Sequence, residues 1–251
     1  MSAINRALDI LFCVAEAGRD VGISEIAQML GSDKATVFRA LKAFEKRDLI
    51  EQNAETKKYR LGLGTVSLAG KKLHGLSVAS RAQPFLSKLS QDMQETVQLS
   101  VRSGDRVLYL AVVESPQPIR VASEVGAFAP MHCTAAGKIF LAFSEPDIES
   151  FVSRSPLEKR TPNTLTDVEA LKRDLQQVRE RGWSMDDEEL LPHLRVVAAP
   201  IRDFSGNVSA AIALGGPTLR VTPEKVTGMV DAVTAAAQEI SGVLCESPSF
   251  T

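Results

Sequence analysis

Residues 23–60 read ISEIAQMLGSDKATVFRALKAFEKRDLIEQNAETKKYR, and the spacing of their apolar side chains predicts two short helices followed by a hairpin. Ser24 is expected to cap the first helix, which carries Ile26, Ala27 and Leu30 on one face. Gly31 should end this helix, because glycine accepts the positive φ that a tight turn between helices needs.

A second helix is expected from Lys34 to about Asp48, with Ser32 or Asp33 as its N-cap. Two short helices around a glycine turn, with the small Ala27 at their crossing, are typical of a helix-turn-helix, here residues 23–42. The buried face of the second helix should comprise Val37, Ala40, Leu41 and Phe44. Residues 49–51 and 59–61 then flank a polar turn and predict a two-stranded wing.

The preceding residues, 5–18, predict an amphipathic helix. Its inward face is expected to comprise Ala7, Leu8, Leu11, Phe12 and Ala15. Three helices and a wing are thus complete within residues 1–64, which favours a DNA-binding winged helix. The alternative is a small helical domain with a solvated charged face.

Base contacts are expected from the first turns of the second helix, where it would enter the major groove. The candidates are Lys34, Ala35, Thr36 and Phe38, with Arg39 and Lys42 placed to reach a base or a phosphate and Lys57 and Lys58 near the wing tip. Arginine pairs with guanine, whereas alanine, phenylalanine and the threonine methyl suit a thymine methyl. Phe38 is equally compatible with a core position.

The net charge of −2 excludes a chain that is basic throughout, so DNA binding would need a local basic patch. Residues 56–91 provide one candidate, because this stretch contains no Asp or Glu. Its basic residues are Lys57, Lys58, Arg60, Lys71, Lys72, Arg81 and Lys88. The three cysteines, Cys13, Cys133 and Cys245, are odd in number and widely spaced, which suggests neither a disulfide framework nor a zinc finger. No signal peptide or membrane span is visible, and a cytoplasmic protein is expected.

Beyond the wing, a linker helix is expected over 65–79, an effector-binding domain over 80–246 and a tail over 247–251. Alternating helix and strand patterns predict an α+β domain with a central, mostly antiparallel sheet. Helices are expected to begin at Pro84 and at Thr222–Pro223, to span 134–143, and to run from a capping box at 166–169 to Gly182. Strands are expected over 97–101, 106–113, 119–121, 196–201 and 208–214. In the first of these strands, Gln98 and Ser100 should face outward.

With these residues placed, the whole chain resembles the IclR family of bacterial transcriptional regulators. The matching segments are 5–11, 23–27, 34–41, 59–62, 131–138, 161–165, 181–183, 186–189, 198–200 and 216–217. The resemblance implies a winged helix joined by a linker helix to a GAF-like effector domain. It also implies a homodimer or homotetramer that binds double-stranded operator DNA and responds to a small anionic metabolite.

Residues 135–137 are small and open a helix, so their backbone N–H groups are expected to hold a carboxylate; close helix–sheet packing is the alternative. By resemblance, Asp186, Leu194, Val196, Ala213 and Gly215 line the effector pocket; Ala135, Ala136 and Gly137 are added to it by the helix-start argument. Several relatives carry Cys at 196 and Ser at 213 and 215, and their absence predicts a bulkier or less oxygenated ligand than glyoxylate or pyruvate. His193 would supply a replacement donor or lie in solvent.

Residues 133–138 resemble a phosphate loop only superficially, since Gly is missing at 132 and Ser or Thr at 139. His132, Cys133, Asp186 and His193 also suit zinc or Cys–His catalysis by type, but not by any compact spacing. The sequence therefore predicts a metabolite-responsive regulator without catalytic residues, metal or cofactor. The rival interpretations are a ligand-independent architectural DNA-binding protein and a Cys/His enzyme.

Overall fold

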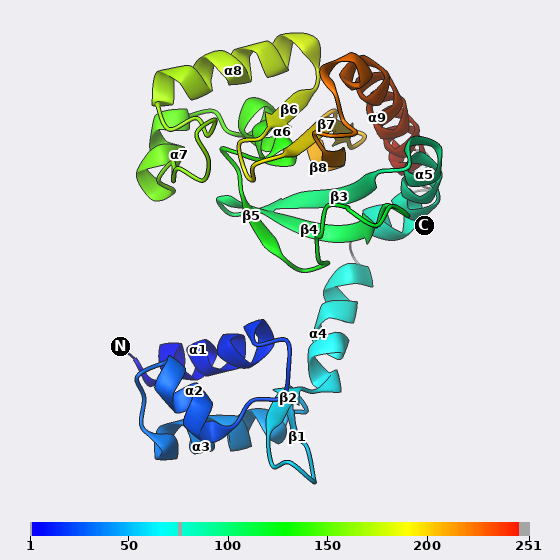
Figure 1. Ribbon diagram of the computed structural model, residues 1–251. Coiled ribbons are helices and arrows are strands. Elements are labelled where there is room, and N and C mark those ends of the chain that lie inside the picture. The colour runs from blue at the N-terminus through cyan, green and yellow to red at the C-terminus, as the bar shows by residue number, and fades with distance from the viewer. Residues whose placement is uncertain (1, 75–76, 246–251) are drawn as a thin grey trace. The chain divides into compact units, whose positions relative to one another are not determined.

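The computed structural model of the protein describes residues 2–74 and 77–245, which form two compact units, Met1–Ser77 and Val78–Thr251 (Figure 1). None of the helices in the described part of the chain is long and apolar enough to cross a membrane. The first unit contains α1 (Ala3–Glu16), α2 (Ile23–Met29), α3 (Lys34–Glu45), β1 (Ile50–Gln52), β2 (Tyr59–Leu61) and α4 (Leu63–His74).

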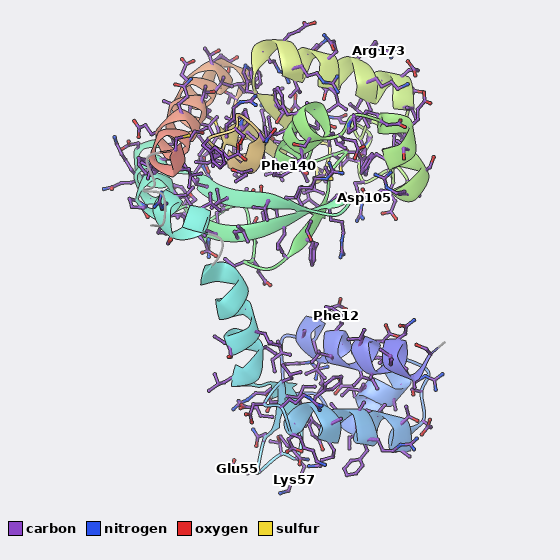
Figure 2. All side chains as sticks on the ribbon, turned by 180° about the vertical axis from the view of Figure 1, so that it is seen from behind. Phe12, Glu55, Lys57, Asp105, Phe140 and Arg173 are labelled. Carbon is purple, nitrogen blue, oxygen red and sulfur yellow. The ribbon has the colours of Figure 1, made fainter. Side chains whose placement is uncertain are left out.

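The first helix exists as predicted, but its predicted inward face is only partly right: Leu11 packs against the core, and Ala7 is half-buried. Ile10 and Val14 are the buried residues of α1, whereas Leu8, Phe12 and Ala15 are exposed. Figure 2 shows Phe12 projecting away from the other helices of its unit. The most buried positions lie about a third of a turn away from the predicted face, because α2 and α3 pack against the Ile10 side.

The helix-turn-helix forms between α2 and α3. Gly22, not Ser24, is the N-cap of α2, and Leu30 is exposed at the C-terminal end. Gly31 adopts φ +57°, as predicted, and Asp33 caps α3 by accepting a hydrogen bond of 2.8 Å from the Thr36 amide. The α3 helix ends at Glu45, earlier than expected.

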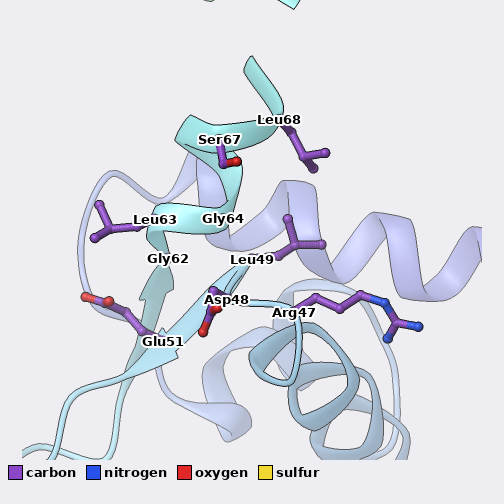
Figure 3. A pocket seen from close by; sticks show the side chains of 9 residues that line it. All are labelled: Arg47, Asp48, Leu49, Glu51, Gly62, Leu63, Gly64, Ser67 and Leu68. Atoms are coloured by element: carbon purple, nitrogen blue, oxygen red, sulfur yellow. The ribbon is translucent and has the colours of Figure 1, made fainter. Parts of the chain in front are cut away.

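The wing and the start of α4 are joined closely. Gly62 and Gly64 donate to the carbonyls of Leu49 and Asp48 at 2.9 and 2.8 Å. A Cβ on Gly62 would lie 2.2 Å from the Asp48 oxygen, so only glycine permits this approach. The hollow of about 600 Å³ beside this junction (Figure 3) is lined by Arg47, Asp48, Leu49, Glu51, Gly62, Leu63, Gly64, Ser67 and Leu68.

The second unit is an α+β domain with a six-stranded sheet, in which all neighbouring strands pair antiparallel in the order β5-β4-β3-β8-β7-β6. Its helices are α5 (Ser77–Met93), α6 (Ala135–Ser144), α7 (Ile148–Arg154), α8 (Val168–Arg181) and α9 (Pro223–Cys245). Its strands are β3 (Thr96–Ser103), β4 (Arg106–Val113), β5 (Phe128–Pro130), β6 (Ser184–Asp187), β7 (Leu194–Arg202) and β8 (Val208–Pro217).

Helices cover both faces of this sheet over its central strands. The α9 helix packs on β7 and β8, and α5 lies beside α9, where Arg81 donates to the Val243 carbonyl at 2.8 Å (Figure 1). The α6 helix packs on the other face, with α8 against it. Gln98 and Ser100 are therefore buried and do not face solvent, which corrects the half-buried pattern predicted for β3.

Other predicted elements differ in detail. No strand forms at 119–121, and the edge strand beside β4 is β5. The α5 helix begins at Ser77 and runs through Pro84, while Asp167, not Thr166, caps α8. The short elements α7 and β6 were not predicted.

Candidate functional site

The exposed side of α3 presents one continuous face. Lys34, Ala35, Phe38 and Arg39 are exposed on it. Phe38 is 45% exposed, so it is not a core residue, and the Lys42 ammonium lies 5.9 Å from its ring centre. Lys42 also pairs with Glu45 at 2.5 Å, whereas Arg39 donates to the Thr36 hydroxyl at 3.2 Å. This face combines cations with apolar groups of the kind that contact base edges.

The wing places two lysines at an exposed turn. Asn53 accepts hydrogen bonds from the amides of Glu55 and Thr56, and Lys57 adopts φ +58°. Lys57 and Lys58 are exposed, and Figure 2 shows Glu55 and Lys57 at the tip. The turn conformation therefore keeps both ammonium groups available to a phosphate backbone.

The basic run at 56–91 does not form one patch. Arg60 is paired with Glu51 at 2.5 Å, and Arg81 and Lys88 belong to the second unit. The side chains of Lys71 and Lys72 lie outside the described part of the structure. Among the described side chains of the first unit, exposed cations are present on α3 and at the wing tip.

A cavity of about 440 Å³ lies in the second unit between the start of α6, strands β3–β8 and the loop after β4. Its lining is mostly apolar. The predicted residues Ala135, Ala136, Asp186, Leu194, Val196 and Ala213 line it together with Gln98, Tyr109, Val121, Ala122, Ser123, Glu124, Ala127, Phe128, Ala129, Pro130, Thr134, Arg160, Leu190 and Leu191.

Three residues predicted for the pocket lie elsewhere. Gly137 packs against the strand end: a Cβ there would lie 2.3 Å from the Met131 carbonyl oxygen. A Cβ on Gly215 would lie 2.5 Å from Val196 Cγ2, so Gly215 permits close strand pairing and leaves no space for ligand. The His193 side chain is 87% exposed and faces Glu188.

The start of α6 contributes Thr134, Ala135 and Ala136 to the cavity wall. Thr134 is the N-cap and accepts from the Gly137 amide at 3.2 Å. Its hydroxyl donates to the Pro130 carbonyl at 2.6 Å, and the Ser184 hydroxyl donates to the Ala135 carbonyl, also at 2.6 Å. These bonds fix the end of α6, whose first N–H groups attract a negative charge.

Asp186 is the buried carboxyl of the cavity, with 1% of its surface exposed. Its Oδ1 accepts from the amides of Glu189 and Leu190 at 2.8 and 3.2 Å. Burial, and secondarily the nearby charge of Glu189, raise its pKa to about 7, although the two amides and Lys138 act in the opposite direction. Burial, and secondarily the charge of Asp186, raise the pKa of Tyr109 to about 12.

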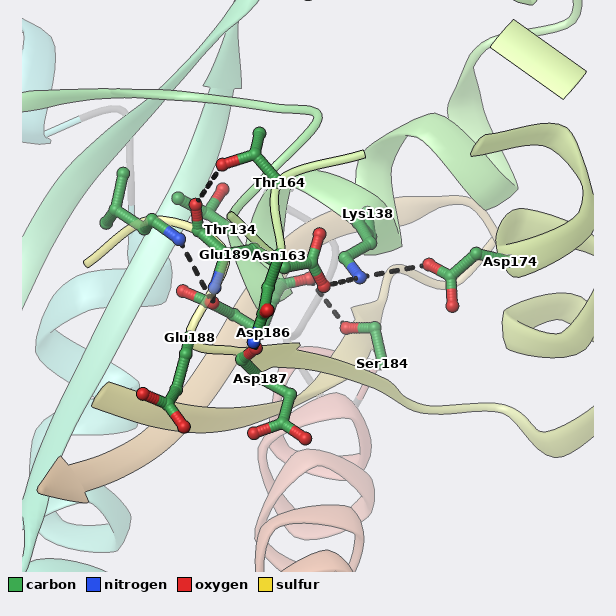
Figure 4. A network of polar contacts seen from close by, with 12 residues as sticks. Thr134, Lys138, Asn163, Thr164, Asp174, Ser184, Asp186, Asp187, Glu188 and Glu189 are labelled. Atoms are coloured by element: carbon green, nitrogen blue, oxygen red, sulfur yellow. Dashed lines mark hydrogen bonds and ion pairs between the residues drawn. The ribbon is translucent and has the colours of Figure 1, made fainter. Parts of the chain in front are cut away.

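A buried ion-pair network supports the turn that holds Asp186 (Figure 4). Lys138, 1% exposed, pairs with Glu189 at 2.5 Å and with Asp174 at 3.0 Å. The carbonyl of Glu189 accepts from the hydroxyls of Thr161 and Thr164. The apparent phosphate-loop lysine thus serves as the internal counter-ion for two carboxylates.

Tyr109, Gln98 and Arg160 were not identified from the sequence as cavity residues. Tyr109 and Gln98 follow ordinary strand alternation, and Arg160 lies in a loop, so no local pattern distinguishes them. Arg160 donates to Glu158 at 2.7 Å and Gln98 donates to Ser123 at 2.5 Å. Gln98 therefore connects β3 to the loop that covers the cavity.

The Cys–His alternative finds little support in the geometry. Cys133 is fully buried, and burial raises its pKa to about 12, so the thiolate that a nucleophile needs is absent near neutral pH. The His132 Nε2–H group is 3.0 Å from the Glu158 carbonyl, to which it donates. Among the described residues, no group of three His, Cys, Asp or Glu side chains is placed to hold a metal ion.

Comparisons with known proteins cover both units. The model of the IclR helix-turn-helix domain matches residues 3–54, and that of the bacterial transcriptional regulator IclR C-terminal domain matches residues 70–242. The chain is 36% identical over 240 residues to the HTH-type transcriptional regulator BhcR of Paracoccus denitrificans, covering 95% of this chain and 86% of the relative. It is 31% identical over 243 residues to the HTH-type transcriptional repressor AllR of Escherichia coli, covering 96% and 90%.

Solved structures agree with this relationship. The Thermotoga maritima IclR superposes with a TM-score of 0.79 at 28% identity, over 96% of this chain and 98% of that one. An IclR homologue from Microbacterium hydrocarbonoxydans, solved in complex with 4-hydroxybenzoate, superposes with a TM-score of 0.85 at 25% identity, over 97% and 99%. The chain therefore belongs to the IclR family of bacterial transcriptional regulators, with a DNA-binding helix-turn-helix domain and an effector-binding C-terminal domain.

Proposed function

We propose that this protein is a cytoplasmic one-component regulator, without catalytic activity, whose effector is a small carboxylic acid with an apolar body. The cavity carries this proposal. Its walls at Val196, Ala213 and Leu194 are apolar, and the amide end of α6 provides a place for one carboxylate. A dry apolar cavity of about 150 Å³ suffices for benzene. The volume of about 440 Å³ therefore accommodates an aromatic or branched acid.

The relative solved with 4-hydroxybenzoate supports the same ligand class. Glyoxylate and pyruvate would fill little of this cavity and leave the wall at Val196 and Ala213 without contacts. A cavity of this kind is not expected in an architectural DNA-binding protein that binds no ligand.

The test is a thermal-shift comparison on the full chain with benzoate, 4-hydroxybenzoate, glyoxylate and pyruvate. Ligands that bind the native state raise its apparent stability. We expect the aromatic acids to raise the melting temperature more than glyoxylate or pyruvate, and Ala213→Leu, which fills the cavity, to remove the effect. Larger shifts with glyoxylate than with both aromatic acids would contradict the proposal.

Operator recognition is assigned to the exposed face of α3, with Lys57 and Lys58 contacting phosphates. Effector binding would change operator affinity only if the ligand binds two arrangements of the protein with different affinity. The assay is fluorescence anisotropy on a site selected from random DNA, with and without ligand. An operator affinity that no bound ligand alters would favour the architectural alternative.

A homodimer is proposed from the outer face of α1. Ile4, Leu8 and Phe12 are 73%, 45% and 59% exposed and follow one another at helical spacing. A second copy is the expected occupant, because a two-fold dimer presents two recognition helices to related half-sites. Sedimentation of Leu8→Glu should show a smaller species, and an unchanged mass would assign self-association to another surface.

A further inference from the structure

Asp186 faces the cavity with one oxygen still available. Both hydrogen bonds that it accepts from described residues end on Oδ1, from the amides of Glu189 and Leu190. Apolar residues of the cavity wall beside this carboxyl group include Val196, its partner on β7, and Leu194. Because Asp186 lines the cavity and no described residue donates to Oδ2, a ligand that fills the cavity is expected to contact this oxygen.

No neighbouring cation is free to neutralise this carboxyl group among the residues that the structure describes. On α6, Lys138 is held by two carboxylates, and in the loop before α8, Arg160 pairs with Glu158. The remaining titratable or charged groups around it are Tyr109 on β4, Glu124 in the covering loop, His132 and Cys133 before α6, Glu189 beside it, and the Asp187–Arg195 and Glu188–His193 pairs. The balance of charge near Asp186 is thus unfavourable to a second anion.

An anionic ligand in the same cavity would add that second negative charge. The Ser184–Ala135 hydrogen bond joins β6 to the first residue of α6, so the expected carboxylate position and Asp186 lie on adjoining parts of one wall. Two carboxylates that share a site of low dielectric constant do not both stay ionised. One of them takes a proton from solvent.

We propose that the protein takes up one proton together with its anionic effector, and that Asp186 carries this proton in the complex. The proposal rests on the cavity being the effector site, as argued above. The protonated Asp186 donates its O–H to a ligand oxygen, whereas an ionised Asp186 would repel the ligand. Because burial already brings the pKa of Asp186 to about 7, this linkage falls in the neutral range of pH. The effector response would then weaken as the pH rises.

The test is calorimetric titration of the full chain with benzoate and 4-hydroxybenzoate from pH 6 to 8.5, in pairs of buffers with different ionisation enthalpies. For a group that titrates near pH 7, we expect Kd to be nearly constant at pH 6 and to rise toward tenfold per pH unit above 7, about thirty-fold over the range. The measured proton uptake should rise from near zero at pH 6 toward one at pH 8.5.

Two variants separate charge from packing. Asp186→Asn should bind both acids with a Kd that does not change with pH and that is lower than wild type at pH 8.5. Tyr109→Phe removes a polar group from the same cavity without changing its charge, and should keep the wild-type pH dependence. The neutral analogue 4-hydroxybenzamide should also show no proton uptake.

The outcomes distinguish this inference from the proposed function. Binding of both acids with the same Kd at pH 6 and 8.5, or loss of binding in Asp186→Asn, would overturn the proton linkage and leave the cavity as the effector site. No binding of either acid at pH 6 would contradict the proposed ligand class. In that case, ¹³C NMR of the aspartate carboxyls, with Asp186→Asn for assignment, decides: titration near pH 7 supports the inference, and titration below pH 5 refutes it.

Discussion

Gly137→Ala tests how the effector cavity is built, because the close approach of α6 to the preceding strand depends on this glycine. A Cβ at this position would lie 2.3 Å from the Met131 carbonyl oxygen, 2.4 Å from Met131 Cα and 2.5 Å from Thr134 Oγ1. Two of these three atoms belong to the backbone, so rotation of a side chain cannot relieve the contact. The helix itself must move away by about 1 Å, since carbon atoms pack at about 3.5 Å or more.

The expected cost follows from these contacts. Overpacking of a close-packed interior costs about 1–3 kcal/mol, and disturbing the Thr134 cap costs about 1 kcal/mol more. The higher helix propensity of alanine offsets about 1 kcal/mol of this cost. We therefore expect Gly137→Ala to destabilise the second unit by about 1–3 kcal/mol. Its ligand binding should weaken too, because the same movement displaces the amides of Ala135 and Ala136.

Gly228→Ala is the matched control. Gly228 lies on an exposed turn of α9, and nothing lies within 4 Å of a Cβ built there. The same substitution should therefore stabilise the domain by about 1 kcal/mol. Urea unfolding followed by fluorescence measures both variants, because the single tryptophan, Trp183, lies in the second unit. If Gly137→Ala is as stable as Gly228→Ala, the inferred close packing at the start of α6 would be contradicted.

Three further predictions follow from charge and burial. Arg39→Ala should weaken specific operator binding by at least tenfold, about 1.4 kcal/mol, and Lys57→Ala should weaken binding to all DNA sequences and lower its salt dependence by about one ion. Fluorescence anisotropy at several salt concentrations measures both effects, and an undiminished complex with Arg39→Ala would exclude Arg39 from operator recognition. Folded-state burial raises the pKa of Asp186 from 3.8 to about 7, so its contribution to stability should be lost as the pH rises between these values, and urea titrations of Asp186→Asn should show a flatter profile. Cys133 should resist a thiol reagent at pH 8 in the native protein, while the exposed Cys245 reacts, and rapid labelling of Cys133 would contradict its burial.

The sequence by itself determined the local elements and the family. The roles of Gly31 and Asp33 could be predicted because turn and cap geometry depend on one or two residues. The long amphipathic helix α8 likewise ends at the predicted Gly182. The antiparallel sheet also follows from the order of strand and helix patterns. Six of the nine residues predicted for the effector pocket line the cavity, because the segments that carry them keep their order and spacing in the family.

Only the tertiary structure decided which faces are covered. The apolar residues of α1 occur on more than one side, so its spacing did not reveal that Leu8 and Phe12 stay exposed. Gln98 looks solvent-facing in a single strand, yet the loop after β4 covers it. Gly215 was expected to line the pocket, but Val196 of the neighbouring strand β7 packs against it. The state of Asp186 likewise depends on burial and on the engagement of Lys138 by Glu189 and Asp174, which are contacts between residues distant in sequence.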